Sequence, residues 1–191
     1  MKKYVFIILL ALPILVTFGF TRSVQNDDYA NFKEEFLTLI NKIRTKGCNC
    51  GNTYYPAASP LVWNDNLEDA ALGHAKDMEK KDYFSHTSKD GRSMSDRIIA
   101  AGYYFKGFKS FMVGENIAYG QTSIKEVTAG WFKSEGHCKN LMNPGFKEIG
   151  VAETGRYWVQ DFGGRESFSA AQQKLIKEGK YRLIQKEPTN H

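Results

Sequence analysis

The sequence predicts an α+β domain, in which amphipathic helices are followed by an antiparallel hairpin. Apolar residues recur at helical spacing at Phe32, Phe36, Ile40 and Ile43, and two β-rich runs near the C-terminus are separated by a turn. Mixed helices and antiparallel strands are typical of this class. With 191 residues and 42% hydrophobic content, the chain can bury one substantial core but hardly two. We therefore expect a single domain.

The N-terminus has the pattern of an export signal. Lys2 and Lys3 precede an uncharged, almost wholly apolar run over residues 5–20, and Thr21 and Ser23 have the small side chains and spacing of a cleavage site. The run is shorter than the ~20 apolar residues that span a bilayer, so a cleaved signal peptide over residues 1–23 is favoured over an uncleaved anchor. No cysteine follows it, which argues against a lipoprotein. We expect an extracytoplasmic protein, secreted or periplasmic, that meets the membrane only if its leader stays.

The charge of the chain excludes few partners. Removal of the leader, which carries Lys2, Lys3 and Arg22 and no acid, would lower the formal net charge from +5 to +2. The remaining lysines of the tail are interpreted as a solvated helix face, so we expect no nucleic-acid partner. The sequence also has no internal repeat, P-loop, dinucleotide glycine fingerprint or H-E-x-x-H zinc helix.

The three cysteines predict one disulfide and one spare thiol in an oxidising compartment. Cys48 and Cys50 are separated by one residue and would form a strained ring, so Cys138 is expected to pair with one of them. A zinc site on the C-x-C pair would need further thiols or a nearby histidine.

The first helix is expected to end at Gly47, and an irregular loop follows to Pro60. Asn64 or Asp65 can cap the second helix, whose apolar face includes His74, interpreted as a structural core histidine. A turn-rich segment over 83–95 then carries His86, which is freer to act as a ligand or an acid–base group. A short helix is expected around residues 94–101.

The second half of the chain contains the remaining polar candidates. Glu115 lies between glycine and apolar residues, where it either accepts backbone hydrogen bonds or serves a metal or a proton. Ser123 and Glu126 form a capping box for a helix that breaks at residues 134–138, where Glu135 and His137 occur together. Residues 148–152 and 156–162 predict a hairpin, and residues 170–184 a peripheral helix.

Eight motifs together resemble the bacterial members of the CAP superfamily, which includes the cysteine-rich secretory, antigen 5 and pathogenesis-related proteins. They are Leu61-Val-Trp-Asn-Asp-Asn-Leu, Ala75-Lys-Asp-Met, Tyr83-Phe-Ser-His-Thr, Gly91-Arg-Ser, Gly114-Glu-Asn-Ile-Ala, Gly136-His-Cys-Lys-Asn-Leu-Met-Asn-Pro, Ile149-Gly-Val-Ala and Tyr157-Trp-Val-Gln-Asp-Phe-Gly. The resemblance covers residues 30–164 and leaves 165–191 as a polar C-terminal extension. It implies an α-β-α sandwich, with a small antiparallel sheet between helical layers and an open cleft.

The resemblance also implies a site. Eukaryotic relatives hold two histidines and two glutamates in the cleft, sometimes with zinc; His86 and Glu115 match two of them, and Glu135 lies one residue from the expected second glutamate. Tyr157 stands where the second histidine is expected, and His137 of the bacterial G-H-C motif would replace it. We therefore expect His86, Glu115, His137 and Glu135 as metal ligands, with zinc the first choice. We expect Tyr157, Gln160 and Asn116 to line the cleft. The bacterial pattern further implies a Cys50–Cys138 disulfide, with Cys48 spare.

These expectations favour a monomeric binding module for a small ligand, which could be a lipid, a metal or a cell-wall fragment. The alternative is a metal-dependent hydrolase of peptide or cell-wall material acting through His86, Glu115 and His137. A second alternative is a surface interaction or defence protein with a vestigial site. A fold alone does not choose among them.

Overall fold

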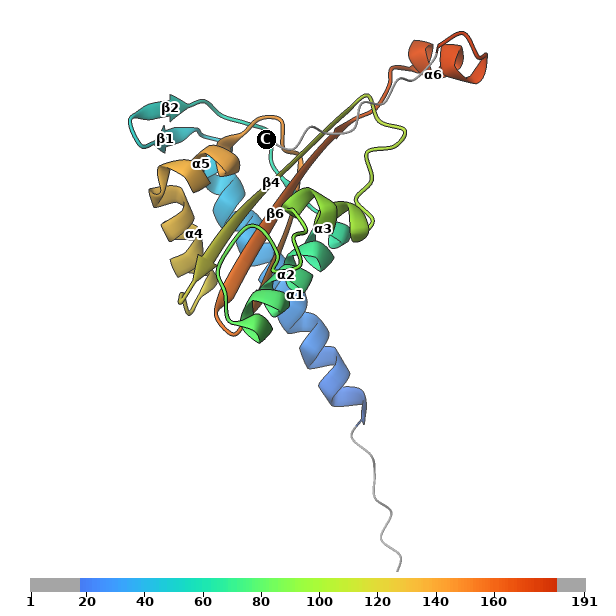
Figure 1. Ribbon diagram of the computed structural model, residues 1–191. Helices are drawn as coiled ribbons and strands as arrows, with labels where there is room; N and C mark the ends of the chain where they lie inside the picture. Colours follow the sequence, from blue (N-terminus) through green and yellow to red (C-terminus); the bar gives the residue numbers. More distant parts are fainter. Residues whose placement is uncertain (1–17, 182–191) are drawn as a thin grey trace, which may run out of the picture.

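The computed structural model describes residues 18–181, with side chains from residue 28 onward. Six helices and six strands follow one another in this part of the chain (Figure 1). The helices are α1 (Phe18–Arg44), α2 (Asp65–Lys81), α3 (Met94–Ala100), α4 (Ile124–Lys133), α5 (Glu135–Met142) and α6 (Ala170–Lys177); the strands are β1 (Cys48–Cys50), β2 (Thr53–Tyr55), β3 (Val62–Trp63), β4 (Ser110–Tyr119), β5 (Glu148–Thr154) and β6 (Tyr157–Glu166).

The main sheet has the strand order β3-β5-β6-β4. Strand β6 pairs antiparallel with β4 on one side and with β5 on the other. The short strand β3 pairs parallel with β5, so the sheet is antiparallel except at this edge. Strand β4 forms the opposite edge, which leaves one of its sides free for contacts with loops and helices.

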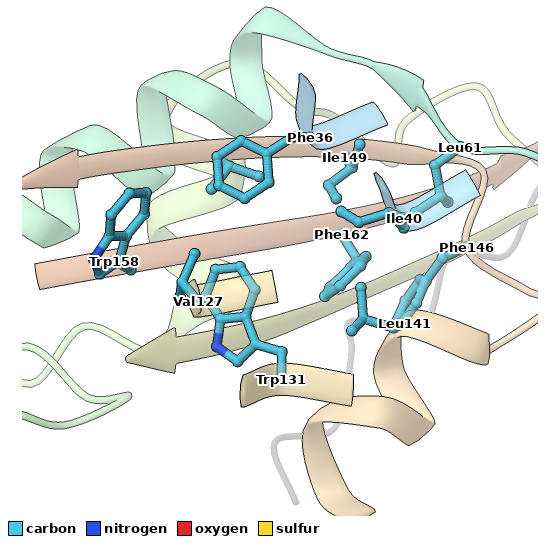
Figure 2. Packing of buried hydrophobic residues seen from close by; sticks show 11 residues of the cluster. Phe36, Ile40, Leu61, Val127, Trp131, Leu141, Phe146, Ile149, Trp158 and Phe162 are labelled. Carbon is cyan, nitrogen blue, oxygen red and sulfur yellow. The ribbon is translucent and has the colours of Figure 1, made fainter. Parts of the chain in front are cut away.

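Helices cover both faces of this sheet, which confirms the expected α-β-α sandwich. Trp158 and Phe162 of β6 face a cluster that includes Phe36 of α1 and Trp131 of α4 (Figure 2). Because side chains alternate along a strand, Val159 points to the other face and packs against α2. Burial of each large side chain in these clusters contributes about 1.5–3 kcal/mol. The two layers therefore hold the sheet, and with it β4, in a fixed position.

Local sequence signals account for several element ends. The side chain of Asn64 caps α2 by accepting hydrogen bonds from the backbone N–H groups of Asn66 and Leu67. Ser123 caps α4, but the Glu126 carboxylate accepts from Thr122 rather than from Ser123, so the expected box is half formed. The β5–β6 hairpin turns at residues 155 and 156, both with positive φ.

The structure corrects one expectation near the first two cysteines. Residues 47–60 contain a two-stranded hairpin, β1–β2, where an irregular loop was expected, with Cys48 opposite Tyr55. Gly51, at φ +59°, supplies the left-handed turn residue that lets the chain reverse. The short hairpin lacks a long alternating run, so its pattern was too brief to recognise.

The ends of the chain fall partly outside the described residues. Most of the predicted leader lies in residues 1–17, and the end of the predicted tail helix in residues 182–191. Within residues 18–181, none of the helices is both long and apolar enough to cross a bilayer. The terminal helix α6 buries none of its side chains.

Candidate functional site

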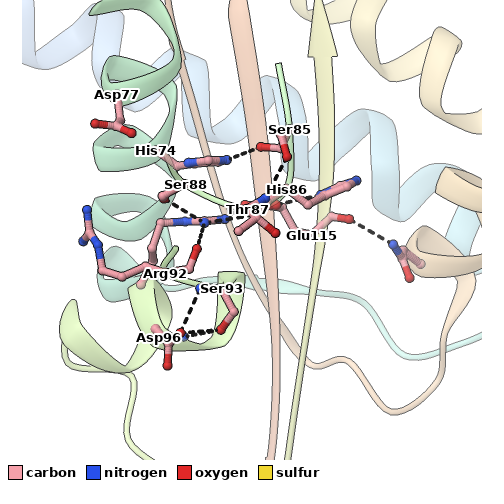
Figure 3. A network of polar contacts seen from close by, with 12 residues as sticks. His74, Asp77, Ser85, His86, Thr87, Ser88, Arg92, Ser93, Asp96 and Glu115 are labelled. Atoms are coloured by element: carbon pink, nitrogen blue, oxygen red, sulfur yellow. Dashed lines mark hydrogen bonds and ion pairs between the residues drawn. The ribbon is translucent and has the colours of Figure 1, made fainter. Parts of the chain in front are cut away.

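His86 and Glu115 meet at the free edge of β4. His86 lies in the segment between α2 and α3, and its imidazole Nδ1 is 2.7 Å from Oε1 of Glu115 (Figure 3). The imidazole is 57% exposed, whereas the carboxylate is only 2% exposed. A hydrogen bond from Nδ1–H to the carboxylate leaves Nε2 with a lone pair, because a neutral imidazole carries one proton.

Arg97 of α3 engages the other oxygen of Glu115. Its Nη2 donates to Oε2 of Glu115 at 2.6 Å, and both side chains are buried. Its Nη1 donates to the backbone carbonyl of His86 and lies within hydrogen-bond distance of Ser88 Oγ. One guanidinium therefore holds both the carboxylate and the loop that carries His86, and it neutralises the buried charge.

Asp161 is a second buried carboxyl group next to Glu115. The two residues are opposite each other on β6 and β4, so their side chains share a face of the sheet. Asp161 is fully buried, and neither of its carboxyl oxygens has a hydrogen-bond partner within the described residues. Burial, and then the charge of Glu115, raise the pKa of Asp161 well above its usual value. The buried site therefore favours the protonated form of the Asp161 carboxyl group.

His137 approaches the same edge from α5, on the opposite side of the sheet. Its side chain is half-buried, and its backbone carbonyl accepts from Asn116 Nδ2 at 3.2 Å. Burial lowers the pKa of His137, and the nearby His86 lowers it further. A lowered pKa favours the neutral form of the His137 ring at pH 7.

The other expected site residues lie elsewhere. Asn116 and Gln160 are fully buried beneath α5 and are joined by a hydrogen bond of 2.9 Å. Tyr157 packs against Tyr119 at the hairpin end of β6, about 13 Å along the strand from residue 161. Glu135 is exposed and pairs with Lys139 at 2.6 Å. None of these four side chains has a polar contact with His86 within the part of the chain described.

The cysteines form a separate cluster at the other side of α5. The implied disulfide is present between Cys50 and Cys138, and Cys48 is the remaining thiol. Among the described residues, these three cysteines are the one group whose possible metal-ligand atoms all lie within 4.8 Å of one another. His86, Glu115 and His137 therefore do not form an equally tight set of three ligand atoms.

Arg97 and Asp161 were not recognised as site residues from the sequence. Arg97 precedes two isoleucines in a short helix, and Asp161 follows Val159 and Gln160 in a β-rich run. A charged residue within such apolar surroundings is a signal that could have identified both, because an ionisable group is rarely buried without a role.

The sequence model of the cysteine-rich secretory protein family (CAP) matches residues 37–162. Two curated proteins of Bacillus subtilis are similar: the uncharacterized membrane protein YlbC, 33% identical over 68% of this chain and 34% of its own length, and the uncharacterized protein YkwD, 40% identical over 56% and 40%. This chain thus spans about a third to two fifths of these relatives.

Two solved structures share the fold. An extracellular protein containing a SCP domain from Bacillus anthracis has a TM-score of 0.56 and 33% identity, over 68% of this chain and 39% of that one. An outer surface protein from Borrelia burgdorferi has a TM-score of 0.54 and 23% identity, over 73% and 94%. The second likeness concerns the fold alone.

Proposed function

The chain belongs to the cysteine-rich secretory protein (CAP) family. We propose that it is an extracytoplasmic binding module in which His86 and His137 hold a divalent metal ion, with zinc the first choice. This ion captures a small anionic ligand.

The observation that carries this proposal is the contact between His86 and Glu115. Metal-binding histidines commonly donate one ring N–H to a carboxylate, which fixes the tautomer and makes the other nitrogen a better ligand. Here Nδ1 meets the buried Glu115 carboxylate, which Arg97 holds from its other side. The exposed imidazole of His86 can then offer Nε2 to an ion.

His137 supplies the second imidazole. Its lowered pKa favours the neutral form of the ring at pH 7, the state that binds a metal. Two protein ligands leave at least two positions of a tetrahedral zinc ion open. Carboxylate or phosphate oxygens of a cell-envelope component are suited to fill them, since zinc accepts oxygen ligands.

The same contacts favour binding over hydrolysis. A hydrolase would need a base that metal-bound water can reach, and the Glu115 carboxylate is only 2% exposed. Both oxygens of Glu115 are engaged, and Glu135 pairs with Lys139. Among the described residues, these are the two glutamates that the family resemblance offers for that role, so turnover would require a rearrangement.

Three observations support a location outside the cytoplasm. The N-terminus carries the basic and apolar pattern of an export signal. The Cys50–Cys138 disulfide is of a kind that persists in oxidising compartments. The similar Bacillus anthracis protein is described as extracellular.

Zinc titration calorimetry on the oxidised protein tests the proposal. We expect one zinc ion per wild-type chain, lost in His86→Ala and in His137→Ala. Glu135→Gln is the matched control: this residue lies near His137 in sequence but pairs with Lys139, so its variant should bind zinc as the wild type does. Zinc binding that both histidine variants retain, or no binding by the wild type, would refute the two-histidine site.

A further inference from the structure

We propose that the three cysteines form a second, redox-gated metal site: when the Cys50–Cys138 disulfide is reduced, Cys48, Cys50 and Cys138 together bind zinc or a similar thiophilic divalent ion.

The spacing of the sulfur atoms supports this site. Cys48 and Cys50 are two residues apart on β1, so their side chains point to the same side of the strand, toward Cys138 of α5. The Sγ atoms of Cys48 and Cys138 are 3.8 Å apart. Two thiolates on a tetrahedral zinc ion, each about 2.3 Å from the metal, are separated by about 3.8 Å. One pair of ligands thus already has the required spacing, and only the bonded pair has to open.

Contacts other than the disulfide hold the two sides of the cluster together. Cys50, Cys138 and Met142 pack into one buried apolar cluster, against which Ile43 and Tyr55 also pack. The buried guanidinium of Arg44 donates to the backbone carbonyl of Leu141, which ties α5 to the end of α1. The sulfur atoms should therefore stay near one another after reduction.

The cluster is accessible from one side. A divalent cation stabilises thiolates directly, so cysteines bind it in their deprotonated form. Cys48 is partly exposed, whereas Cys50 and Cys138 are buried, so an ion can enter from the side of Cys48.

A dithiol can act as the reductant of the Cys50–Cys138 disulfide. The bond between the sulfur atoms of Cys50 and Cys138 breaks, the two cysteines become thiols, and the dithiol is oxidised to a cyclic disulfide. Zinc then displaces one proton from each of the three thiols, and its fourth position is left to water or an external ligand. When an external disulfide takes up two electrons from Cys50 and Cys138 and two protons from solvent and becomes two thiols, the Cys50–Cys138 bond re-forms. Two of the three ligands are then lost, the ion is released and Cys48 is protonated again.

This inference uses none of the residues of the proposed histidine site, so the two can fail separately. The experiment is done in the His86→Ala, His137→Ala background, which removes the imidazoles of that site. The protein is reduced with a dithiol, freed of it by anaerobic gel filtration, and titrated with Co²⁺, whose thiolate complexes have a distinctive charge-transfer absorption, and then with Zn²⁺ in competition.

We expect one cobalt ion per reduced chain with thiolate charge transfer, displaced by zinc. Cys48→Ser keeps the Cys50–Cys138 pair but removes one ligand, so its reduced form should bind cobalt more weakly than the reduced parent does. The oxidised chain should show no thiolate absorption with cobalt. Near-ultraviolet circular dichroism reports whether the reduced, metal-free chain keeps its tertiary packing. Equal affinity in Cys48→Ser, or binding only by a chain that has lost its packing, would overturn the proposal.

Discussion

Two neighbouring residues of α5 take part in two unlike regions. His137 belongs to the edge of β4, where buried charges are balanced by one another, and Cys138 belongs to the hairpin side, where sulfur atoms lie in an apolar cluster. Successive helical residues point about 100° apart, so one short helix can serve both regions. The first region therefore depends on charge pairing, whereas the second depends on a covalent link and apolar packing.

Arg97→Met should cause the largest loss of stability. It leaves the Glu115 carboxylate buried without its cation, and removing one partner of a buried ion pair costs about 3–5 kcal/mol. Urea unfolding monitored by tryptophan fluorescence measures this loss. The control is Arg92→Met, because Arg92 forms an exposed ion pair with Asp90 and its loss should change stability by less than about 0.5 kcal/mol. Equal losses in the two variants would contradict the role assigned to Arg97.

Cys138→Ser should cause a smaller loss of stability than Arg97→Met. Loss of the disulfide costs about 2–4 kcal/mol, because the unfolded chain is no longer constrained. Cys50→Ser should cost less, since Cys48 lies 3.8 Å from Cys138 and can form a replacement disulfide. Urea unfolding together with disulfide mapping by mass spectrometry compares the two. Cys50→Ser losing as much stability as Cys138→Ser, with no Cys48–Cys138 bond, would show that Cys48 cannot substitute.

Asp161→Asn tests how the buried carboxyl group next to Glu115 affects the pH dependence of stability. The folded-state pKa of Asp161 is raised, so the native state keeps a proton that the unfolded chain releases above about pH 4, and stability is lost as the pH rises. Asparagine does not titrate. The variant should match the wild type near pH 4 and exceed it by about 1–3 kcal/mol at pH 8. Unfolding curves at the two pH values test this; a variant that is less stable at pH 8 would contradict a neutral Asp161.

Titration of His74 should change the free energy of unfolding least, and this change should have the opposite pH dependence to that of Asp161. Burial lowers its pKa; of the charges around it, Glu115 and Asp77 oppose the shift and Arg97 adds to it. Below about pH 6.5 the unfolded chain therefore binds a proton at His74 that the native state does not bind. The free energy of unfolding falls as the pH drops below this value. The slope from this group is at most about 1.4 kcal/mol per pH unit. His74→Gln should flatten the profile between pH 5 and 7, as measured by urea unfolding; an unchanged slope would mean that His74 does not titrate there.

Much of the fold was predictable because its signals are local. Asn64 before an apolar helical stripe, and the turn between two β-rich runs, each depend on a few neighbouring residues. Motif order then indicated the layers and the Cys50–Cys138 pair. A short stretch of sequence thus specifies the cap and the turn by itself, whereas the layers and the disulfide were indicated by the family resemblance.

The contacts of the buried charges could not be predicted, because their partners are distant in sequence. Arg44 is fully buried and donates to the carbonyl of Leu141, 97 residues away, a contact that helical periodicity cannot indicate. Glu115 was expected as a metal ligand, but no sequence pattern indicated that Arg97 engages one of its oxygens. Candidate residues could therefore be identified from the sequence, but the contacts among them could not.

The central claim is that Glu115 fixes His86 so that Nε2, with Nε2 or Nδ1 of His137, can receive an ion. Nitrogen-15 NMR of the histidine rings tests it most directly, because protonated and unprotonated ring nitrogens have different shifts. For the neutral ring of His86 without metal, we predict the proton on Nδ1 and none on Nε2. On zinc addition, we predict a shift of that Nε2 together with one nitrogen of His137. A His86 ring protonated at Nε2, or zinc that shifts neither ring, would contradict the claim.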